Sequence, residues 1–232
     1  MNPFAKHESH TTGSITTYKV LTTVTWLLSI VVSFYYSLNE PHDGFKIRKR
    51  IWDQNYLYPT AFTMNSVIGN IYWVVLFILQ AAYIGHLFSK KAEVVNAAAS
   101  VGSHFILNNL FHFAFVMLFV RSHFIWAELI VILNFINLSA LYFRHNSYPR
   151  FIHLPVVSGP LAWTFVAIYW NGALMIRHPD HLLPRIFGNI FIWSLLVYGG
   201  FFIVIYKVRG FFSRVTLWCP LTGCRTIRWA SA

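Results

Sequence analysis

Hydrophobic residues run along this chain in six long blocks that shorter polar segments separate. The blocks cover residues 20–38, 64–87, 97–120, 124–143, 154–176 and 186–206. Each holds roughly 19–24 residues, enough for an α-helix to cross a hydrocarbon core about 30 Å thick. Because lipid offers the backbone no hydrogen-bond partners, such segments cross a membrane as helices. The pattern predicts an all-α, polytopic transmembrane helical bundle of about six spans with no soluble domain.

The polar segments predict how the rest of the chain is organised. Residues 1–19 form a polar N-terminal segment, residues 20–206 the six-span transmembrane domain, and residues 207–232 a basic C-terminal tail. Only Arg121, Ser122 and His123 separate the third and fourth blocks, which predicts an antiparallel helical hairpin. The tail contains no further apolar span, which leads to the hypothesis that it is aberrant, as in a truncated gene model.

Composition supports the membrane assignment. Hydrophobic residues make up 56% of the chain and charged residues 11%, against about 25% charged in soluble domains. This excludes a soluble enzyme, a disordered protein and a disulfide scaffold. The net charge of +11 would indicate nucleic acid in a soluble protein, but here the basic residues lie between apolar blocks. We therefore expect the lipid bilayer and no nucleic acid as partner, with anionic headgroups contacting Lys46, Arg48, Lys49 and Arg50.

Polar side chains inside the blocks are costly in lipid, so each one predicts a partner or a function. Glu128 is the single carboxylate within a block, and His112 on the preceding block lies about one helical turn deeper. A contact between these two side chains would indicate a proton-linked or cation-binding site. The alternative is a structural hydrogen bond, or a carboxylate near the headgroups that stays hydrated.

Four asparagines lie at similar depth on the two halves of the hairpin, counted from its turn: Asn108, Asn109, Asn134 and Asn137. Amide hydrogen bonds between such helices contribute roughly 0.6–2 kcal/mol each. The four asparagines therefore predict a structural link between the two helices, with a substrate site as the alternative.

A histidine stripe on the third block raises the question of a metal or haem. His104 and His112 are about 12 Å apart along a helix axis, too far for one metal ion with bonds near 2 Å. The other blocks offer no facing histidine at mid-depth. We expect no metal and no cofactor.

Tryptophans lie deep in several blocks. Trp73, Trp163 and Trp170 lie away from the block ends, and Trp163 and Trp170 share one helix face. They predict an aromatic-lined pocket for a flat apolar ligand, with ordinary packing as the alternative. Trp52 and Trp126 are placed for an interfacial aromatic belt.

Three stretches carry a family resemblance. They are YLYPTAFTMNSVIGNIYWVVLFILQAAYIGHLF at residues 56–88, NNLFHFAFVMLFVRSHFIWAELIVILNFINLSALYFRH at residues 108–145 and PRFIHLPVVSGPLAWTFVAIYWNGALM at residues 149–175. They resemble a family of fungal multi-pass membrane proteins catalogued as domain of unknown function 1774, over roughly residues 1–206. The resemblance implies an architecture and no catalytic residues.

A fainter similarity rests on prolines that precede aromatic residues. Pro59, Phe62 and Trp73, and then Pro160 with Trp163, are similar to spans of TspO-type tryptophan-rich sensory proteins. Those are five-helix membrane proteins that bind porphyrins and sterols. This chain departs from them by its six expected spans and its long first loop.

The leading hypothesis is a small-molecule-binding sensor or a transporter-like membrane protein with an apolar ligand. The alternatives are a non-catalytic membrane scaffold, and an intramembrane enzyme or proton-coupled carrier using Glu128 and His112. The motifs G-x-S-x-G and H-E-x-x-H and a Walker loop are absent, which favours a protein that is not an enzyme. The candidate ligand-binding residues are Trp73, Asn108, His112, Glu128, Asn134, Trp163 and Trp170.

Overall fold

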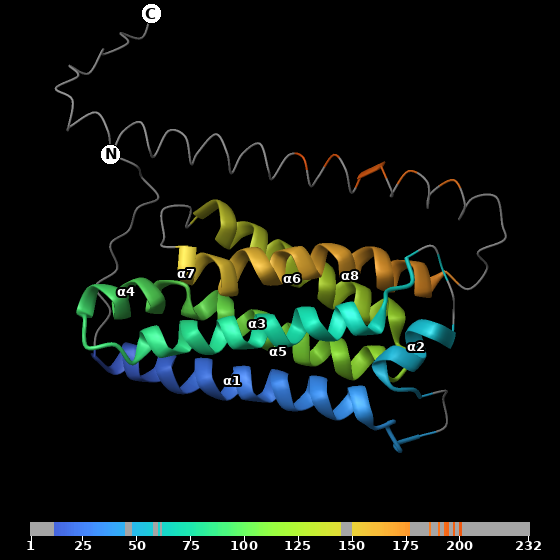
Figure 1. Ribbon diagram of the computed structural model, residues 1–232, viewed down its shortest axis with the longest axis horizontal. Helices are drawn as coiled ribbons and strands as arrows, with labels where there is room; N and C mark the ends of the chain where they lie inside the picture. Colours follow the sequence, from blue (N-terminus) through green and yellow to red (C-terminus); the bar gives the residue numbers. More distant parts are fainter. Residues whose placement is uncertain are drawn as a thin grey trace, which may run out of the picture. The chain divides into compact units, whose positions relative to one another are not determined.

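The computed structural model describes residues 12–44, 48–57, 60, 62–144 and 150–176, and individually residues 186, 190, 193, 194, 197 and 200. The chain separates into two units, Met1–Arg177 and His178–Ala232. Within the described residues every regular element is helical, which confirms the predicted all-α fold. Figure 1 shows the helices of the first unit.

In chain order the helices are α1 (Thr12–Leu38), α2 (Ile51–Leu57), α3 (Ser66–Leu87), α4 (Ala92–Ser100), α5 (Gly102–Phe119), α6 (Phe124–Arg144), α7 (Arg150–His153), the π-helical η1 (Leu154–Ser158) and α8 (Gly159–Met175). Of the described helices, α1, α3, α5 and α6 are long and apolar enough to cross a membrane. The protein is therefore an integral membrane protein. Most of the sixth expected span, and all of the basic tail, lie outside the described residues.

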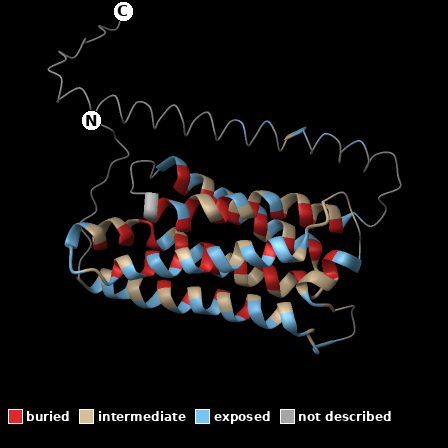
Figure 2. Cartoon of the chain, viewed as in Figure 1, coloured by how far each residue is buried: buried red, intermediate tan, exposed pale blue. Residues whose placement is uncertain are grey.

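Helix α1 buries a polar face and exposes an apolar one. Thr25 and Ser29 are buried, whereas Val24 and Val31 are more than half exposed. Exposed positions follow the outer side of α1 in Figure 2. A water-soluble helix has the reverse pattern, so α1 is built to face lipid. The hydroxyl of Thr25 donates to the carbonyl oxygen of Leu21 at 2.7 Å, so the hydrogen-bond donor of this side chain has its partner within the same helix.

Helices α5 and α6 form the predicted antiparallel hairpin. Two backbone hydrogen bonds close the C-terminal end of α5. His123 N donates to Leu118 O at 3.0 Å, and Ser122 N donates to Phe119 O at 3.0 Å. This pairing is a Schellman motif, which needs one residue in the left-handed region. Ser122 takes that conformation with φ of 59°.

The third expected span, residues 97–120, is wrong as a single helix. The chain breaks at Val101, between α4 and α5. At the break, the hydroxyl of Tyr83 donates to the carbonyl oxygen of Ala98 at 2.8 Å. The ring of Tyr18 packs on Gly102, where an added Cβ would lie 3.0 Å from the ring. Contacts with α1 and α3 thus accompany the interruption.

The fifth expected span, residues 154–176, is helical but begins earlier, at α7, and includes a π-turn. In η1, Gly159 N donates to Leu154 O, one residue beyond the α-helical partner. The corresponding partner of the Pro155 carbonyl would be the nitrogen of Pro160, which has no hydrogen. The side-chain amide of Gln80 donates to that carbonyl instead, at 3.4 Å. Helix α3 thereby supplies the donor that the proline lacks.

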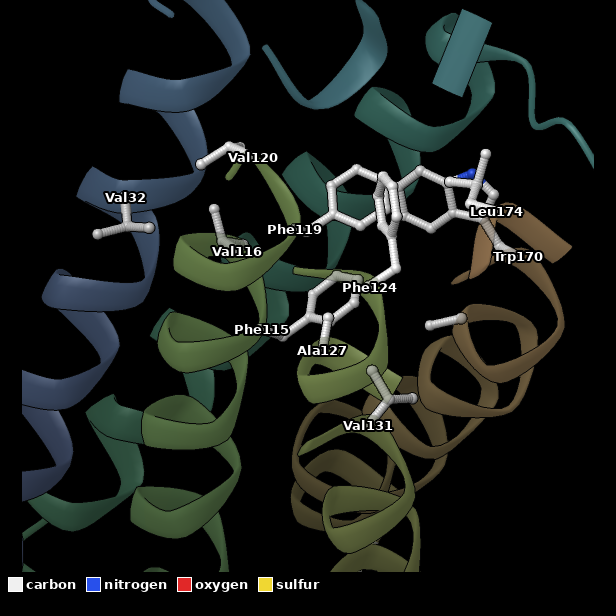
Figure 3. Close-up of a cluster of buried hydrophobic side chains, with 11 residues drawn as sticks. Val32, Phe115, Val116, Phe119, Val120, Phe124, Ala127, Val131, Trp170 and Leu174 are labelled. Atoms are coloured by element: carbon white, nitrogen blue, oxygen red, sulfur yellow. The ribbon is translucent and has the colours of Figure 1, made fainter. Parts of the chain in front are cut away.

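One apolar core joins four helices. Figure 3 shows side chains from α1, α5, α6 and α8 meeting there, with Trp170 of α8 beside Phe119 of α5. Their ring centroids are 4.5 Å apart. The cluster consists of Val32, Phe115, Val116, Phe119, Val120, Phe124, Ala127, Val131, Ala167, Trp170 and Leu174. This core forms the floor of the cavity next to it.

Candidate functional site

A cavity of about 270 Å³ lies beside this core, among α1, α2, α3, α5 and α8. Its walls are mainly aromatic, and none of the described residues that line it is charged. The lining residues are Ser33, Phe34, Ser37, Leu38, Ile51, Trp52, Asn70, Trp73, Val74, Phe77, His112, Phe115, Val116, Phe119, Trp163 and Trp170. Four of the seven ligand-binding candidates from the sequence are among them.

The three deep tryptophans converge on this cavity from two helices. Trp73 of α3 and Trp163 of α8 meet edge to face, with ring centroids 4.9 Å apart. Trp163 and Trp170, two turns apart on α8, have centroids separated by 6.1 Å. Such aromatic contacts are each worth about 0.5–1.5 kcal/mol beyond the apolar area they bury. The tryptophans therefore give the cavity packed walls.

Trp52 contributes to the cavity wall, and its place in an interfacial belt stays a prediction. It stacks on Trp170 with centroids 6.2 Å apart, and its indole nitrogen donates to Asn70 Oδ1 at 2.9 Å. Its ring lies over Gly69, where an added Cβ would come within 2.3 Å of it. A side chain at position 69 would displace Trp52, so the glycine allows the lining to form. Trp126, the other expected belt residue, is 62% exposed.

Asn55 fixes the short helix α2 over this end of the bundle. Its Oδ1 accepts from Trp170 Nε1 at 2.8 Å and from the backbone nitrogen of Met64 at 3.1 Å. Its Nδ2 donates to Met64 O at 2.9 Å. Asn65, which follows Met64, caps the N-terminus of α3 because its Oδ1 accepts a hydrogen bond from Val67 N at 2.9 Å. Asn55 is not among the residues predicted for the site, because nothing in its local sequence pattern marks it.

His112 supplies a buried polar group to the cavity wall. Its ring lies against Trp73, with centroids 4.3 Å apart, and its Nε2 is 2.8 Å from the hydroxyl of Ser33. Ser33 in turn donates to Ser29 O at 2.8 Å. The hydroxyl has only one hydrogen, so the imidazole Nε2 is the donor in the pair.

Part of the cavity lining, which we call its mouth, is exposed on α1 and α3. Phe34 and Leu38 on α1 and Val74 on α3 are 49%, 71% and 42% exposed. These exposed side chains are apolar, as on a helix surface that faces lipid.

Glu128 and His112 do not meet, and Glu128 makes the structural hydrogen bond that was the alternative for this residue. Glu128 accepts from Asn171 Nδ2 of α8 at 2.8 Å, and the same amide donates to Phe124 O at 2.8 Å. Glu128 therefore faces α8, whereas His112 faces α1 and α3. The depth estimate was compatible with a contact, but the two side chains point to different neighbours around their helices.

The asparagine link between α5 and α6 is confirmed. Asn134 Nδ2 donates to Asn108 Oδ1 at 3.0 Å. One turn away, His104 Nδ1 donates to Asn137 Oδ1 at 2.7 Å, and Asn137 Nδ2 returns a bond to His104 O at 3.2 Å. Neither Asn108 nor Asn134 lines the cavity. These two candidates join helices in this structure.

The basic loop residues are ion-paired within their own region. Arg48 contacts Asp43 at 2.6 Å, and Asp43 also contacts Arg121 of the hairpin turn at 2.9 Å. The two guanidinium groups, that of Arg48 first, hold the pKa of Asp43 below its ordinary value of 3.8. Lys49 pairs with Glu40 and Arg50 pairs with Asp53, at 3.3 and 2.6 Å. Contact of these residues with lipid headgroups stays a prediction, and Lys46 lies outside the described residues.

Searches against family models, curated proteins and solved structures found no match to this chain. The resemblances to the fungal membrane family and to the tryptophan-rich sensory proteins stay predictions. Among the described residues, no group of three His, Cys, Asp or Glu side chains is arranged to hold a metal ion.

Proposed function

We propose that this integral membrane protein binds a small apolar molecule in the cavity between α1, α2, α3, α5 and α8, as a sensor or carrier of that molecule. The observation that carries the proposal is the uncharged aromatic lining. Ligand sites are typically mostly apolar concavities with a few placed polar groups. Here those groups are Ser33, Ser37, Asn70 and His112.

The position of the cavity also supports this proposal. The exposed residues at its mouth are apolar side chains of α1 and α3, which suits the entry of an apolar molecule that is dissolved in the bilayer. The aromatic walls are held by contacts that need no ligand, such as the bond from Trp170 to Asn55. A site formed in advance binds without a large ordering cost.

The alternative of a proton-coupled carrier or intramembrane enzyme required Glu128 and His112 to act together. With Glu128 bonded to Asn171 and His112 bonded to Ser33, that alternative has no shared site to support it. The scaffold alternative predicts that nothing enters the cavity, so one binding experiment separates it from our proposal.

The experiment compares naphthalene binding to wild-type protein and two variants in lipid nanodiscs, by calorimetry. Val74→Trp places a large ring at the mouth, whereas Val75→Trp adds the same ring at the next position, which is 50% exposed against 42% for Val74 and does not line the cavity. We expect wild type and Val75→Trp to bind one equivalent, and Val74→Trp to bind at least about tenfold more weakly. No saturable binding to wild type, or equal binding to both variants, would contradict the proposal.

A further inference from the structure

The hydrogen-bonding groups on the cavity wall restrict the chemistry of its ligand, given the proposed function. Charge is the first restriction. Because no described lining residue carries a charge, an ionised ligand would enter without a counter-charge, at a large desolvation cost. The ligand must therefore be neutral.

The serine hydroxyls on α1 present acceptors to the cavity. Ser37 donates its only hydroxyl hydrogen to Ser33 O at 2.7 Å, and Ser33 donates its own to Ser29 O at 2.8 Å. Each oxygen keeps lone pairs, and that of Ser33 accepts from His112. Ser37 lines the cavity with an oxygen that can only accept while this helix bond persists.

His112 on α5 carries a second acceptor. Its Nε2 carries the hydrogen donated to Ser33, so the neutral ring has an unprotonated Nδ1. The indole hydrogens of Trp52 and Trp170 are already donated to Asn70 and Asn55. Ser37 therefore presents an acceptor on the wall formed by α1, and the ring that carries the unprotonated Nδ1 of His112 lines the wall formed by α5. Asn70 adds the donor of its side-chain amide on the wall formed by α3, which a hydroxyl oxygen and a methoxy oxygen can both accept.

Size and shape complete the description. A cavity of about 150 Å³ admits one benzene ring, and this cavity measures about 270 Å³. That volume suits two fused rings and is just below the range of about 300–1,000 Å³ that is typical of drug-sized ligands. The rings of Trp73 and Trp163 offer faces and edges against which a flat molecule can pack.

We infer that the cavity selects a neutral bicyclic aromatic molecule that bears one hydrogen-bond donor, such as a hydroxyl or a ring N–H, directed at Ser37 and His112. The donor needs an acceptor once the ligand has left the lipid for the apolar cavity, because an unpaired donor there is costly. Meeting an acceptor in the cavity then distinguishes it from a molecule of the same shape without a donor.

Three probes of nearly the same shape test this inference: 2-naphthol with a donor, 2-methoxynaphthalene with only an acceptor, and naphthalene with neither. Binding is measured by calorimetry in nanodiscs, with each affinity referred to the probe's mole fraction in the lipid, so that partitioning cancels. We expect 2-naphthol to bind about five- to tenfold more tightly than 2-methoxynaphthalene, as one extra hydrogen bond allows.

Two variants locate the effect. Ser37→Ala and His112→Phe should each lower the preference for 2-naphthol over 2-methoxynaphthalene, measured within the same variant, by about threefold or more. Thr23→Val is the control, because it removes a hydroxyl that is bonded to Lys19 O on the same helix but lies outside the cavity lining. If His112→Phe fails to fold, Ser37→Ala alone decides, because its hydroxyl bonds only within α1.

The outcomes separate the two proposals. Naphthalene binding with no preference for 2-naphthol, or a preference that survives in Ser37→Ala, would overturn the donor inference and leave the proposed function standing. If none of the three probes binds wild type, the proposed function fails and the donor inference fails with it.

Discussion

The α5–α6 seam and the cavity between α1 and α3 both contain polar side chains within apolar helices, but the two regions use them differently. In the seam, Asn134 donates directly to Asn108, and both residues are 5% exposed. In the cavity, Ser37 satisfies its hydrogen on its own helix and leaves an acceptor facing space. The polarity of a residue within a span therefore does not reveal its role. The location of its hydrogen-bond partner does.

The largest expected effect concerns the wall that the cavity shares with the core. Trp170→Ala should lower the free energy of unfolding by about 3–5 kcal/mol, because it removes a buried ring and its contacts with Phe119 and Trp52. Denaturant titration in mixed micelles measures the loss. Trp126→Ala, at an exposed position, should cost less than about 1 kcal/mol. Similar losses in both variants would contradict the assignment of Trp170 to a packed wall.

Depth along the helices could be predicted from the sequence, because each residue advances a helix by about 1.5 Å. The three-residue turn fixed the register of the hairpin, so Asn108 and Asn134 were correctly expected to meet. The apolar blocks likewise predicted an integral membrane protein. The residue count also placed Glu128 and His112 at depths that allow a contact. The two side chains do not meet, because they point in different directions around their helices.

Direction around a helix depends on which helices are neighbours, and a single sequence does not give that order. Glu128 consequently met Asn171 on α8. The place of Trp52 in the cavity wall could not be predicted, because it depends on bonds from Asn55 that hold α2 to a residue nine positions further along the chain. The break at Val101 depends on contacts from Tyr18 and Tyr83, so no local pattern predicts it.

A double-mutant cycle tests the contrast between seam and cavity directly. Replacing Asn108 and Asn134 by Leu, singly and together, should give a coupling energy of about 0.6–2 kcal/mol, because the double variant leaves no unpaired amide of this pair. The matched cavity cycle, Ser37→Ala with Asn70→Ala, should give a coupling below about 0.5 kcal/mol, because these side chains do not bond each other. Additive losses in the asparagine cycle would remove the distinction between the two regions.

The smallest effect concerns the ion pairs that link the first loop to the hairpin turn. Asp43 has a lowered pKa beside Arg48 and Arg121, so its pairs stabilise the fold above its unfolded pKa of about 3.8. That contribution is lost as the pH falls through the lower, folded pKa. The unfolding temperature of wild type should therefore fall more steeply than that of Asp43→Asn between about pH 5 and about pH 2. Parallel curves would show that these exposed pairs add nothing measurable.

The most direct test of the central claim is ¹⁹F NMR of protein labelled with 5-fluorotryptophan and titrated with naphthalene in nanodiscs. Each resonance is assigned by a Trp→Phe variant. Because Trp73 and Trp163 line the cavity, the account predicts that their signals shift and saturate together, while the signal of lipid-exposed Trp126 does not saturate. Signals of Trp73 and Trp163 that stay unchanged, or that follow Trp126 without saturating, would contradict it.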